Sequence, residues 1–267
     1  MRFKGKTAII TGASSGLGRA LALDLARERM NLVLAARNAD ALNQIATQIE
    51  SLNSTPMVQP TDVTDQAQCQ VLIQRAVEKF GKIDYLILSA GISMWVRFDE
   101  ITDISILQKV MDTNYFGAVN CILPALPHLK ENRGSIVAIS SAQAVIGVPH
   151  HTGYSASKHA LRGFLEALEF EVGDDIHILN VMPGWIRGTN LRANAFAGDG
   201  SCLSGTPQHD DQAVGLQDAS VRIISSMGKR RRELYIPAKL RVLPWLRVIS
   251  SGWLKFVIKR AVNKQNR

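Results

Sequence analysis

The feature that most constrains the fold is a glycine-rich turn between an apolar segment and an alanine- and leucine-rich one. Residues 7–10 predict a short buried strand, and residues 19–29 have the composition of a helix. Between them, Gly12, Gly16 and Gly18 permit a tight turn and close approach of a ligand to the backbone. A strand, such a turn and a helix in this order predict a dinucleotide site, with the pyrophosphate at the helix N-terminus. The spacing G-x-x-x-G-x-G is one residue longer than the common G-x-G-x-x-G, and an ordinary glycine-rich loop is the alternative.

Strand-like and helix-like segments alternate along most of the 267 residues. Further strands are predicted over 31–36, 57–59, 84–88, 134–141, 176–182 and 234–236. Helices are predicted over 40–52, 65–79, 104–118, 154–172 and 212–227. This alternation, without an internal repeat, predicts an α/β chain with a single doubly wound parallel sheet and helices on both faces. With 46% hydrophobic residues, the chain can bury a core without metals or disulfides.

The cysteines, the N-terminal segment and the hydropathy indicate a cytoplasmic protein. Cys69, Cys121 and Cys202 are far apart and form no C-x-x-C pair, which argues against a disulfide framework and against a zinc site. We expect each thiol to be buried. No signal-peptide pattern opens the chain, and no uncharged apolar run is long enough to span a bilayer.

The net charge of +8 comes from the C-terminal end of the chain. From Lys229 onward, twelve Lys and Arg residues accompany one acid, Glu233, and this local charge of +11 leaves −3 for the first 228 residues. The body therefore lacks the basicity of a nucleic-acid binder, and no zinc-finger or RNA-binding motif is present.

The end of the second predicted strand indicates which dinucleotide binds. Sites for NAD carry an acid at this point to hold the ribose hydroxyls. This chain has Ala36 and then Arg37, so a carboxylate is absent and a guanidinium is present. A guanidinium suits a 2′-phosphate, and we expect NADP(H) to be preferred over NAD(H). The alternative is a solvent-facing arginine at a strand end.

A second candidate site is the pair Tyr154 and Lys158. At i and i+4 of a helix the two side chains share one face. A nearby ammonium is expected to lower the pKa of the phenol, which is otherwise too high for proton transfer at neutral pH. Ser155, Ala156 and Ser157 are small and are expected to leave room for a ligand. An exposed helix with a solvated lysine is the alternative for the pentapeptide alone.

Other candidate residues follow the predicted strands, where ligands of a doubly wound sheet bind. They are Asp62, Ala90-Gly91, Ser141 and Pro183-Gly184. With the glycine-rich turn and Arg37, they predict one site along the carboxyl edge of the sheet.

Taken together, these residues and Asn114 resemble the short-chain dehydrogenase/reductase (SDR) family, over about residues 5–237. The resemblance implies a Rossmann fold, here with a C-terminal helical extension over 238–267. It also implies a catalytic set: Tyr154 transfers a proton, Lys158 lowers its pKa and holds the nicotinamide ribose, Ser141 stabilises the substrate oxygen, and Asn114 holds a water in the proton relay. The implied cofactor-binding residues are Gly12, Ser14, Ser15, Gly16, Leu17, Gly18, Arg37, Asp62, Val63, Ala90, Gly91, Tyr154, Lys158, Pro183, Gly184, Ile186 and Thr189.

Two departures from the family pattern affect these expectations. The family's Asn-Asn-Ala-Gly is Leu88-Ser89-Ala90-Gly91 here, so looser packing is expected beside the cofactor. Gly188 occupies the family's usual threonine position, and Thr189 follows one residue later, which puts the contact of Thr189 with the carboxamide in doubt.

Residues flanking the catalytic set can shape a substrate pocket. His150, His151, Met94, Trp95 and Trp185 are expected to serve packing rather than catalysis. The segment 190–211 has little periodicity and occupies the place of the family's substrate loop, so it is a candidate lid. On the helix after Tyr154, Arg162, Phe164, Leu165 and Leu168 can form either a subunit contact or monomer core; the family resemblance implies a homodimer or tetramer.

The basic tail has two open interpretations. On one continuous helix Trp245, Leu246, Ile249, Trp253, Phe256 and Val257 would share a face, with Arg241, Lys255 and Lys259 opposite. That pattern fits an amphipathic helix on anionic lipid, peripheral to the cytoplasmic face of a membrane. A helix docked on the body or on a partner subunit fits equally well.

The sequence thus predicts an NADP(H)-dependent oxidoreductase that acts on the alcohol/carbonyl pair of a bulky apolar or lipid-like small molecule. The competing class is a non-catalytic NADP(H)-binding redox sensor or membrane-peripheral scaffold, which the joint presence of Asn114, Ser141, Tyr154 and Lys158 disfavours. A sugar-nucleotide epimerase is a third interpretation, disfavoured by the glycine spacing and the shorter chain.

Overall fold

A seven-stranded parallel sheet forms the centre of the computed structural model, which describes residues 2–203, 213–250, 252–255 and 258. The strands lie in the order β3-β2-β1-β4-β5-β6-β9, and every neighbouring pair is parallel. Their bounds are β1 (Thr7–Thr11), β2 (Asn31–Ala36), β3 (Thr55–Pro60), β4 (Tyr85–Leu88), β5 (Ser135–Ile139), β6 (His177–Pro183) and β9 (Glu233–Ile236). The predicted single parallel sheet is confirmed. A separate pair of short strands, β7 (Ile186–Arg187) and β8 (Val214–Gly215), was not predicted.

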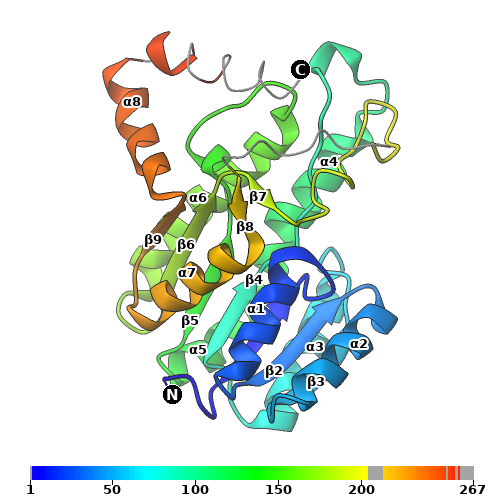
Figure 1. Cartoon of the computed structure of the whole chain (residues 1–267), viewed down its shortest axis with the longest axis vertical. Helices are drawn as coiled ribbons and strands as arrows, with labels where there is room; N and C mark the ends of the chain where they lie inside the picture. The colour runs from blue at the N-terminus through cyan, green and yellow to red at the C-terminus, as the bar shows by residue number, and fades with distance from the viewer. Residues whose placement is uncertain (1, 204–212, 251, 256–257, 259–267) are drawn as a thin grey trace.

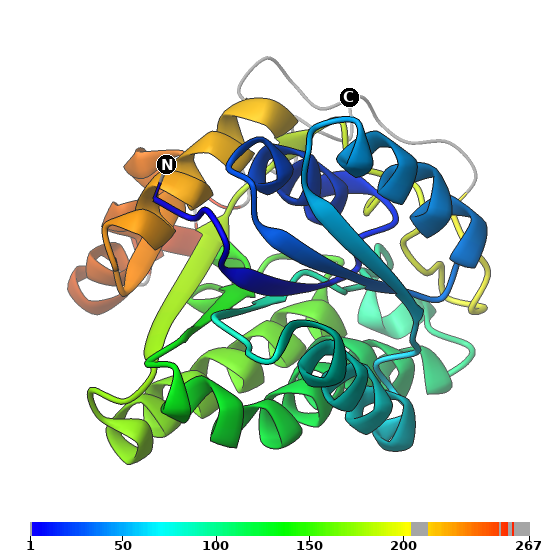
Figure 2. The same ribbon diagram turned by 90° about the horizontal axis from the view of Figure 1, so that it is seen from below.

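Helices cover both faces of the sheet, as predicted (Figure 1). Figure 2 shows the sheet between two helical layers. One layer contains α1 (Gly16–Arg27), α2 (Ala39–Glu50) and α7 (Leu216–Gly228), and the other contains α3 (Gln66–Phe80), α5 (Gly117–Glu131) and α6 (Thr152–Val172). Alternate residues of β1 face opposite layers: Ala8 and Ile10 pack in the first core and Ile9 in the second. Such burial on both faces explains why the central strands are continuously apolar.

The predicted helix over 104–118 differs from the structure in its end and in its regularity. The chain forms α4 (Ser105–Met111), then a π-helical turn, η2 (Asp112–Phe116), then α5. The helical path continues to Glu131 through Pro124 and Pro127. Burial of the apolar face of α5 in the core outweighs the local cost of the prolines. The π-turn places Asn114 where a regular helix would not, and such turns are frequent at functional sites.

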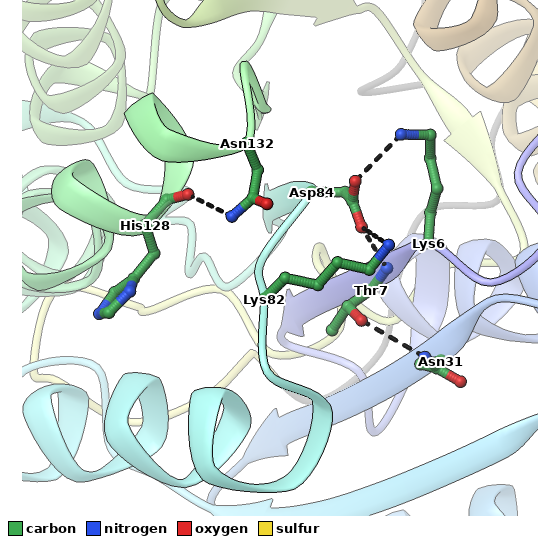
Figure 3. Close-up of polar contacts among 7 residues, drawn as sticks. All are labelled: Lys6, Thr7, Asn31, Lys82, Asp84, His128 and Asn132. Carbon is green, nitrogen blue, oxygen red and sulfur yellow. Dashed lines mark hydrogen bonds and ion pairs between the residues drawn. The ribbon is translucent and has the colours of Figure 1, made fainter.

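A buried carboxylate joins the starts of two central strands at the amino edge of the sheet (Figure 3). Asp84 accepts a hydrogen bond from the Thr7 backbone N–H at 2.8 Å, and its other oxygen lies 3.0 Å from the Lys6 ammonium. Lys82 adds a second cation at 3.4 Å. The charged groups at this edge satisfy one another, and the candidate site residues all lie at the opposite edge.

Two expectations about side-chain burial are resolved by the core. Leu165 and Leu168 are buried in the core of this chain, so they belong to the monomer. Cys69 and Cys121 are buried as expected, with their Sγ atoms 3.5 Å apart. The expectation was wrong for Cys202, which is exposed and forms an isolated β-bridge with Phe196. Within the described part of the chain, no helix has both the length and the apolar character needed to cross a bilayer.

The tail is bent rather than continuous. After η4 (Ala238–Val242), helix α8 (Leu243–Ile249) ends where Ser250 becomes extended at φ −155° and ψ 93°. Because the helix is interrupted at Ser250, residues before and after the break do not continue one helical face, and the prediction of a single face from Trp245 to Val257 was wrong. Phe256, Val257 and Lys259 lie outside the described residues.

The tail also has one docked side and one exposed side. Leu243 and Leu254 are buried against Val145, Ile146 and their neighbours, and the Arg247 guanidinium donates to the Val145 carbonyl at 3.0 Å. On the other side Trp245 and Trp253 are 67% and 55% exposed, and Val248 and Ile249 are exposed beside them. One side of the tail is therefore docked on the body of this chain, and the other carries exposed apolar side chains.

Candidate functional site

The glycine-rich turn has no space for side chains at two of its glycines. A Cβ on Gly12, which has φ +66°, would lie 2.8 Å from the Cα of Ala90. A Cβ on Gly18 would collide with the carbonyl oxygen of Gly12. Gly16 starts α1 with φ +50°. The turn therefore leaves backbone N–H groups uncovered at a helix N-terminus, which is the arrangement that binds a pyrophosphate.

The segment after β4 is held by Thr11, which belongs to the glycine-rich motif of the sequence but was given no role there. The Thr11 hydroxyl accepts hydrogen bonds from the backbone N–H groups of Ser89 and Ala90, at 3.1 and 3.2 Å. These bonds fix Ala90 and Gly91 next to the glycine-rich turn without the family's two asparagines. A buried hydroxyl on β1 therefore anchors the backbone of this segment.

Asn114 fixes the next stretch of this loop. It is buried, its Oδ1 accepts from the Ile92 N–H at 2.9 Å, and its amide donates to the Ile92 carbonyl at 2.9 Å and to the Ser157 hydroxyl at 3.0 Å. A cavity of about 10 Å³, lined among others by Asn114 and Lys158, lies beside it. That space is about the size of one water molecule.

Tyr154 and Lys158 lie together on α6 as the spacing predicted. Both are buried, and the Lys158 Nζ lies 5.7 Å from the centre of the Tyr154 ring and donates to the Ile139 carbonyl at 3.1 Å. Burial raises the pKa of Tyr154 to about 12, against the lowering effect of the Ser141 hydroxyl. Burial also lowers the pKa of Lys158 to about 8. The phenol pKa thus moves in the direction opposite to the expected one, because loss of solvation outweighs the neighbouring polar groups.

The small residues between them do not leave open space. Ser155 and Ser157 are buried and hydrogen-bonded, and only Ala156 is exposed. Ser157 donates to the Tyr154 carbonyl at 2.8 Å while it accepts from Asn114, so it joins α6 to the π-turn.

Ser141 is positioned by Gln143, which the sequence analysis missed. The Gln143 backbone N–H donates to the Ser141 Oγ at 3.1 Å, and the Gln143 side-chain oxygen accepts from the Ser155 hydroxyl at 2.8 Å. A single buried residue thus links the turn after β5 to the first turn of α6. The only signal in the sequence was its place two residues after Ser141.

The remaining predicted cofactor residues lie along the same edge. Arg37 is exposed directly after β2, and the Ala13 N–H of the glycine-rich turn donates to the Ala35 carbonyl at 3.2 Å. Asp62 follows β3 and accepts from the Thr64 N–H at 2.9 Å, while Val63 is buried. Ser14 and Ser15 lie in the turn, and Leu17 is buried in the first turn of α1.

The segment after β6 crosses over the glycine-rich turn. Pro183 ends β6, Gly184 follows it, and Ile186 is buried in β7. The Thr189 side chain lies 3.7 Å from a Cβ built on Gly16, although its hydroxyl donates to the Ile186 carbonyl at 3.3 Å. Thr189 therefore reaches the cofactor edge despite its shift by one position.

Aromatic residues pack together beside Tyr154. The His151 ring centre lies 5.8 Å from that of Tyr154 and 4.7 Å from that of Trp95, and Trp185 lies 6.2 Å from His151. Burial lowers the pKa of His151 to about 4, so this ring is neutral at pH 7. The described residues contain no cluster of His, Cys, Asp or Glu suited to a metal ion.

The model of the short chain dehydrogenase family matches residues 6–200. The chain belongs to this family. Short chain dehydrogenases are oxidoreductases that use a nicotinamide dinucleotide, and the closely packed glycine-rich turn fits that cofactor. The candidate catalytic residues Ser141, Tyr154 and Lys158 all lie within the matched range.

Relatives with similar sequences cover nearly the whole chain. 11-beta-hydroxysteroid dehydrogenase 1A from Arabidopsis thaliana is 33% identical over 244 residues, which is 89% of this chain and 70% of that protein. A dehydrogenase/reductase SDR family protein 7-like from Anopheles gambiae is 34% identical over 271 residues, covering 98% and 84%. Among solved structures, an alcohol dehydrogenase from the archaeon Thermococcus sibiricus complexed with 5-hydroxy-NADP has a TM-score of 0.73 at 24% identity, over 86% of this chain and 95% of that one. This likeness shows the shared fold.

Proposed function

We propose that the protein is an NADP(H)-dependent reductase or dehydrogenase acting on the alcohol/carbonyl pair of a bulky apolar substrate. The observation that carries the proposal is the convergence of Asn114, Ser141, Tyr154 and Lys158 at the carboxyl edge of the sheet, held by buried hydrogen bonds. The aromatic surfaces of Trp95 and Trp185 and the names of relatives as hydroxysteroid dehydrogenases support an apolar substrate. Purified protein assayed with NADPH against steroid, retinoid and long-chain carbonyl compounds tests it.

The residues have distinct roles in this proposal. The nicotinamide supplies or accepts the hydride. Tyr154, with its pKa raised to about 12, is a protonated phenol at neutral pH and can give its proton to the oxygen of a reacting carbonyl. The Ser141 hydroxyl donates to the same oxygen and stabilises its developing charge. Lys158, with its pKa near 8, is mostly an ammonium at pH 7 and can replace the proton that the phenol loses.

The hydrogen bonds of Asn114 limit how it can take part in a proton path to Lys158. Both amide hydrogens of Asn114 are already donated, so only an oxygen of this residue can take part in the relay. A water in the adjoining cavity of about 10 Å³ would accept from Lys158 and donate to such an oxygen.

Preference for NADP(H) is proposed from the exposed Arg37 beside the turn. No acid follows β2 there, and within the described residues no carboxylate pairs with Arg37. We expect NADPH to bind at least about tenfold more tightly than NADH, or ~1.4 kcal/mol. Arg37→Ala should remove most of that difference, as measured by fluorescence titration of both cofactors. Arg222→Ala, on the outer face of α7, is the control, and equal wild-type affinities would contradict the assignment.

We also propose that the exposed side of the tail contacts membranes. Trp245, Val248, Ile249 and Trp253 are exposed apolar side chains on a strongly basic segment, which is the chemistry of an interfacial anchor. Anionic lipid adds about 1 kcal/mol for each nearby Lys or Arg, and salt screens this part.

In flotation assays, full-length protein should bind anionic vesicles at low salt, and binding should weaken without vanishing at high salt. Replacing Trp245 and Trp253 by Ser should remove the part that survives high salt without lowering the melting temperature, because both rings are exposed. Phe170→Ser, which changes a 90% exposed aromatic on α6, is the matched control. Protein that ignores anionic vesicles at low salt would exclude the membrane proposal.

A further inference from the structure

Arg192 is an arginine buried without a hydrogen-bonding partner, and two aromatic rings, Trp95 and His151, lie between it and Tyr154. The residue is 5% exposed and lies in the turn after β7. None of its three guanidinium nitrogens has a hydrogen-bond partner among the described residues. An unpaired buried charge costs several kcal/mol, so an arginine kept in this state needs an explanation.

The guanidinium is held by ring faces only. Its central carbon lies 4.2 Å from the centre of the Trp95 ring and 5.1 Å from that of Trp185. Stacking uses the faces of the planar group, whereas its N–H donors point outward in the plane of the group. Stacking therefore leaves a fork of donors that matches a planar, bidentate anion such as a carboxylate.

The nearby acids already have other partners. Glu100 and Asp199 line an adjacent groove with Trp95, but Glu100 lies 3.6 Å from Arg97, and Asp199 accepts from Ser201 at 2.7 Å. His151, at 4.7 Å from Trp95 between their ring centres, is neutral at pH 7 because burial lowers its pKa to about 4. No described residue thus provides the negative charge that Arg192 lacks.

Arg192 is connected to Tyr154 by a continuous chain of aromatic contacts. The guanidinium carbon lies 4.2 Å from the centre of the Trp95 ring. The Trp95 and His151 ring centres are 4.7 Å apart, and those of His151 and Tyr154 are 5.8 Å apart. A single molecule of moderate size can place its carbonyl at Tyr154 and a second group at Arg192.

We propose that Arg192 binds a carboxylate of the substrate, so that the preferred substrate is an oxo acid or hydroxy acid with an apolar body. The proposal rests on the oxidoreductase function proposed above. The apolar body packs against the two tryptophans and the carboxylate takes the free N–H fork. The donors are closed off from solvent in the structure, so the anion enters as the turn around Arg192 opens.

Paired substrates test the proposal. 4-Benzoylbenzoate and 12-oxododecanoate are compared with their methyl esters, which keep the apolar body and the carbonyl but lose the charge. The wild type should reduce each acid with a kcat/KM at least about tenfold higher than that of its ester. Arg192→Met should remove this preference, mainly through KM, and leave the ester within about twofold. Arg192→Lys should retain part of it, and Arg97→Met, which alters an exposed arginine paired with Asp99, should leave it intact.

Two readouts that do not depend on turnover separate this proposal from the function itself. The acids, and not the esters, should change the tryptophan fluorescence of the wild type, because Arg192 is stacked on Trp95 and Trp185. This result would stand even if none of the compounds were reduced. Arg192→Met should melt no lower than the wild type without ligand, because it removes an unpaired buried charge and keeps the stacked volume.

Three outcomes would overturn the proposal. Equal loss for acid and ester in Arg192→Met, with a lower melting temperature, would make Arg192 a packing residue. If the wild type reduced each acid with no higher kcat/KM than its methyl ester, the proposal would be wrong. Asp210 and Asp211 lie outside the described residues; if their replacement by Asn destabilised the wild type but not Arg192→Met, an internal ion pair would explain the arginine instead.

Discussion

Tyr154→Phe should lower turnover by at least ~10³-fold while NADPH affinity changes little, since a positioned proton donor contributes roughly 10²–10⁴-fold. The phenyl ring keeps the buried volume and loses only the hydroxyl, so the fold should be unaffected. Steady-state assays together with fluorescence titration of NADPH measure the two effects separately. Lys158→Ala should weaken both turnover and NADPH binding, because the resemblance gives this ammonium a role in each.

Tyr235→Phe is the matched control for this experiment. Tyr235 is also buried, at 7% exposed, but it lies on β9, outside the catalytic group. It should retain near wild-type turnover. A Tyr154→Phe protein with near wild-type activity would instead favour the non-catalytic, NADP(H)-binding interpretation.

Gly18→Ala should abolish measurable NADPH binding, with a loss of affinity of more than about a hundredfold, ~2.7 kcal/mol. The added Cβ meets the carbonyl of Gly12 and lies 3.3 Å from the Cα of Ala13, so the turn must open. Both atoms are backbone, which cannot move aside as a flexible side chain would. Cofactor titration and thermal melts measure the change.

Gly163→Ala is the control, because at this helical glycine an added Cβ is expected to be tolerated. A Cβ on Gly163, on the exposed side of α6, meets no atom within 4 Å. Alanine favours a helix by about 1 kcal/mol over glycine, so this variant should melt slightly higher and bind NADPH normally. A Gly18→Ala protein that also bound NADPH normally would show that the turn does not hold the cofactor.

The sequence predicted the sheet, and it predicted that the candidate residues meet at one edge, because both depend on local patterns. Apolar runs identified all seven strands of the main sheet, a strand end located Ser141, and the i, i+4 spacing located the pair Tyr154 and Lys158. The roles that the sequence did not predict depend on contacts between segments that are distant in the chain. Thr11 is ordinary in the sequence and becomes an anchor because β1 lies next to β4. Gln143 and Arg192 gain their significance from hydrogen bonds and rings supplied by other parts of the chain.

The direction of the Tyr154 pKa shift could not be predicted from the i, i+4 spacing, because it depends on burial by other parts of the chain. The i, i+4 spacing specifies that Lys158 is near, but it does not specify that both groups lose their water. Burial opposes charge on each of them and raises the pKa of the phenol while it lowers that of the ammonium.

Because the tail docks on the turn after Ser141, the support of the proposed catalytic site extends beyond Pro237. Leu243 and Leu254 cover Val145 and Ile146, in the same short connection that carries Ser141 and Gln143. A protein truncated after Pro237 would expose those side chains to water and lose the Arg247 bond to the backbone of that connection. Such a shortened chain would lose the support of Ser141, the proposed oxyanion donor, as well as the basic segment. Single substitutions on the exposed side of the tail therefore separate membrane binding from catalysis more cleanly than truncation does.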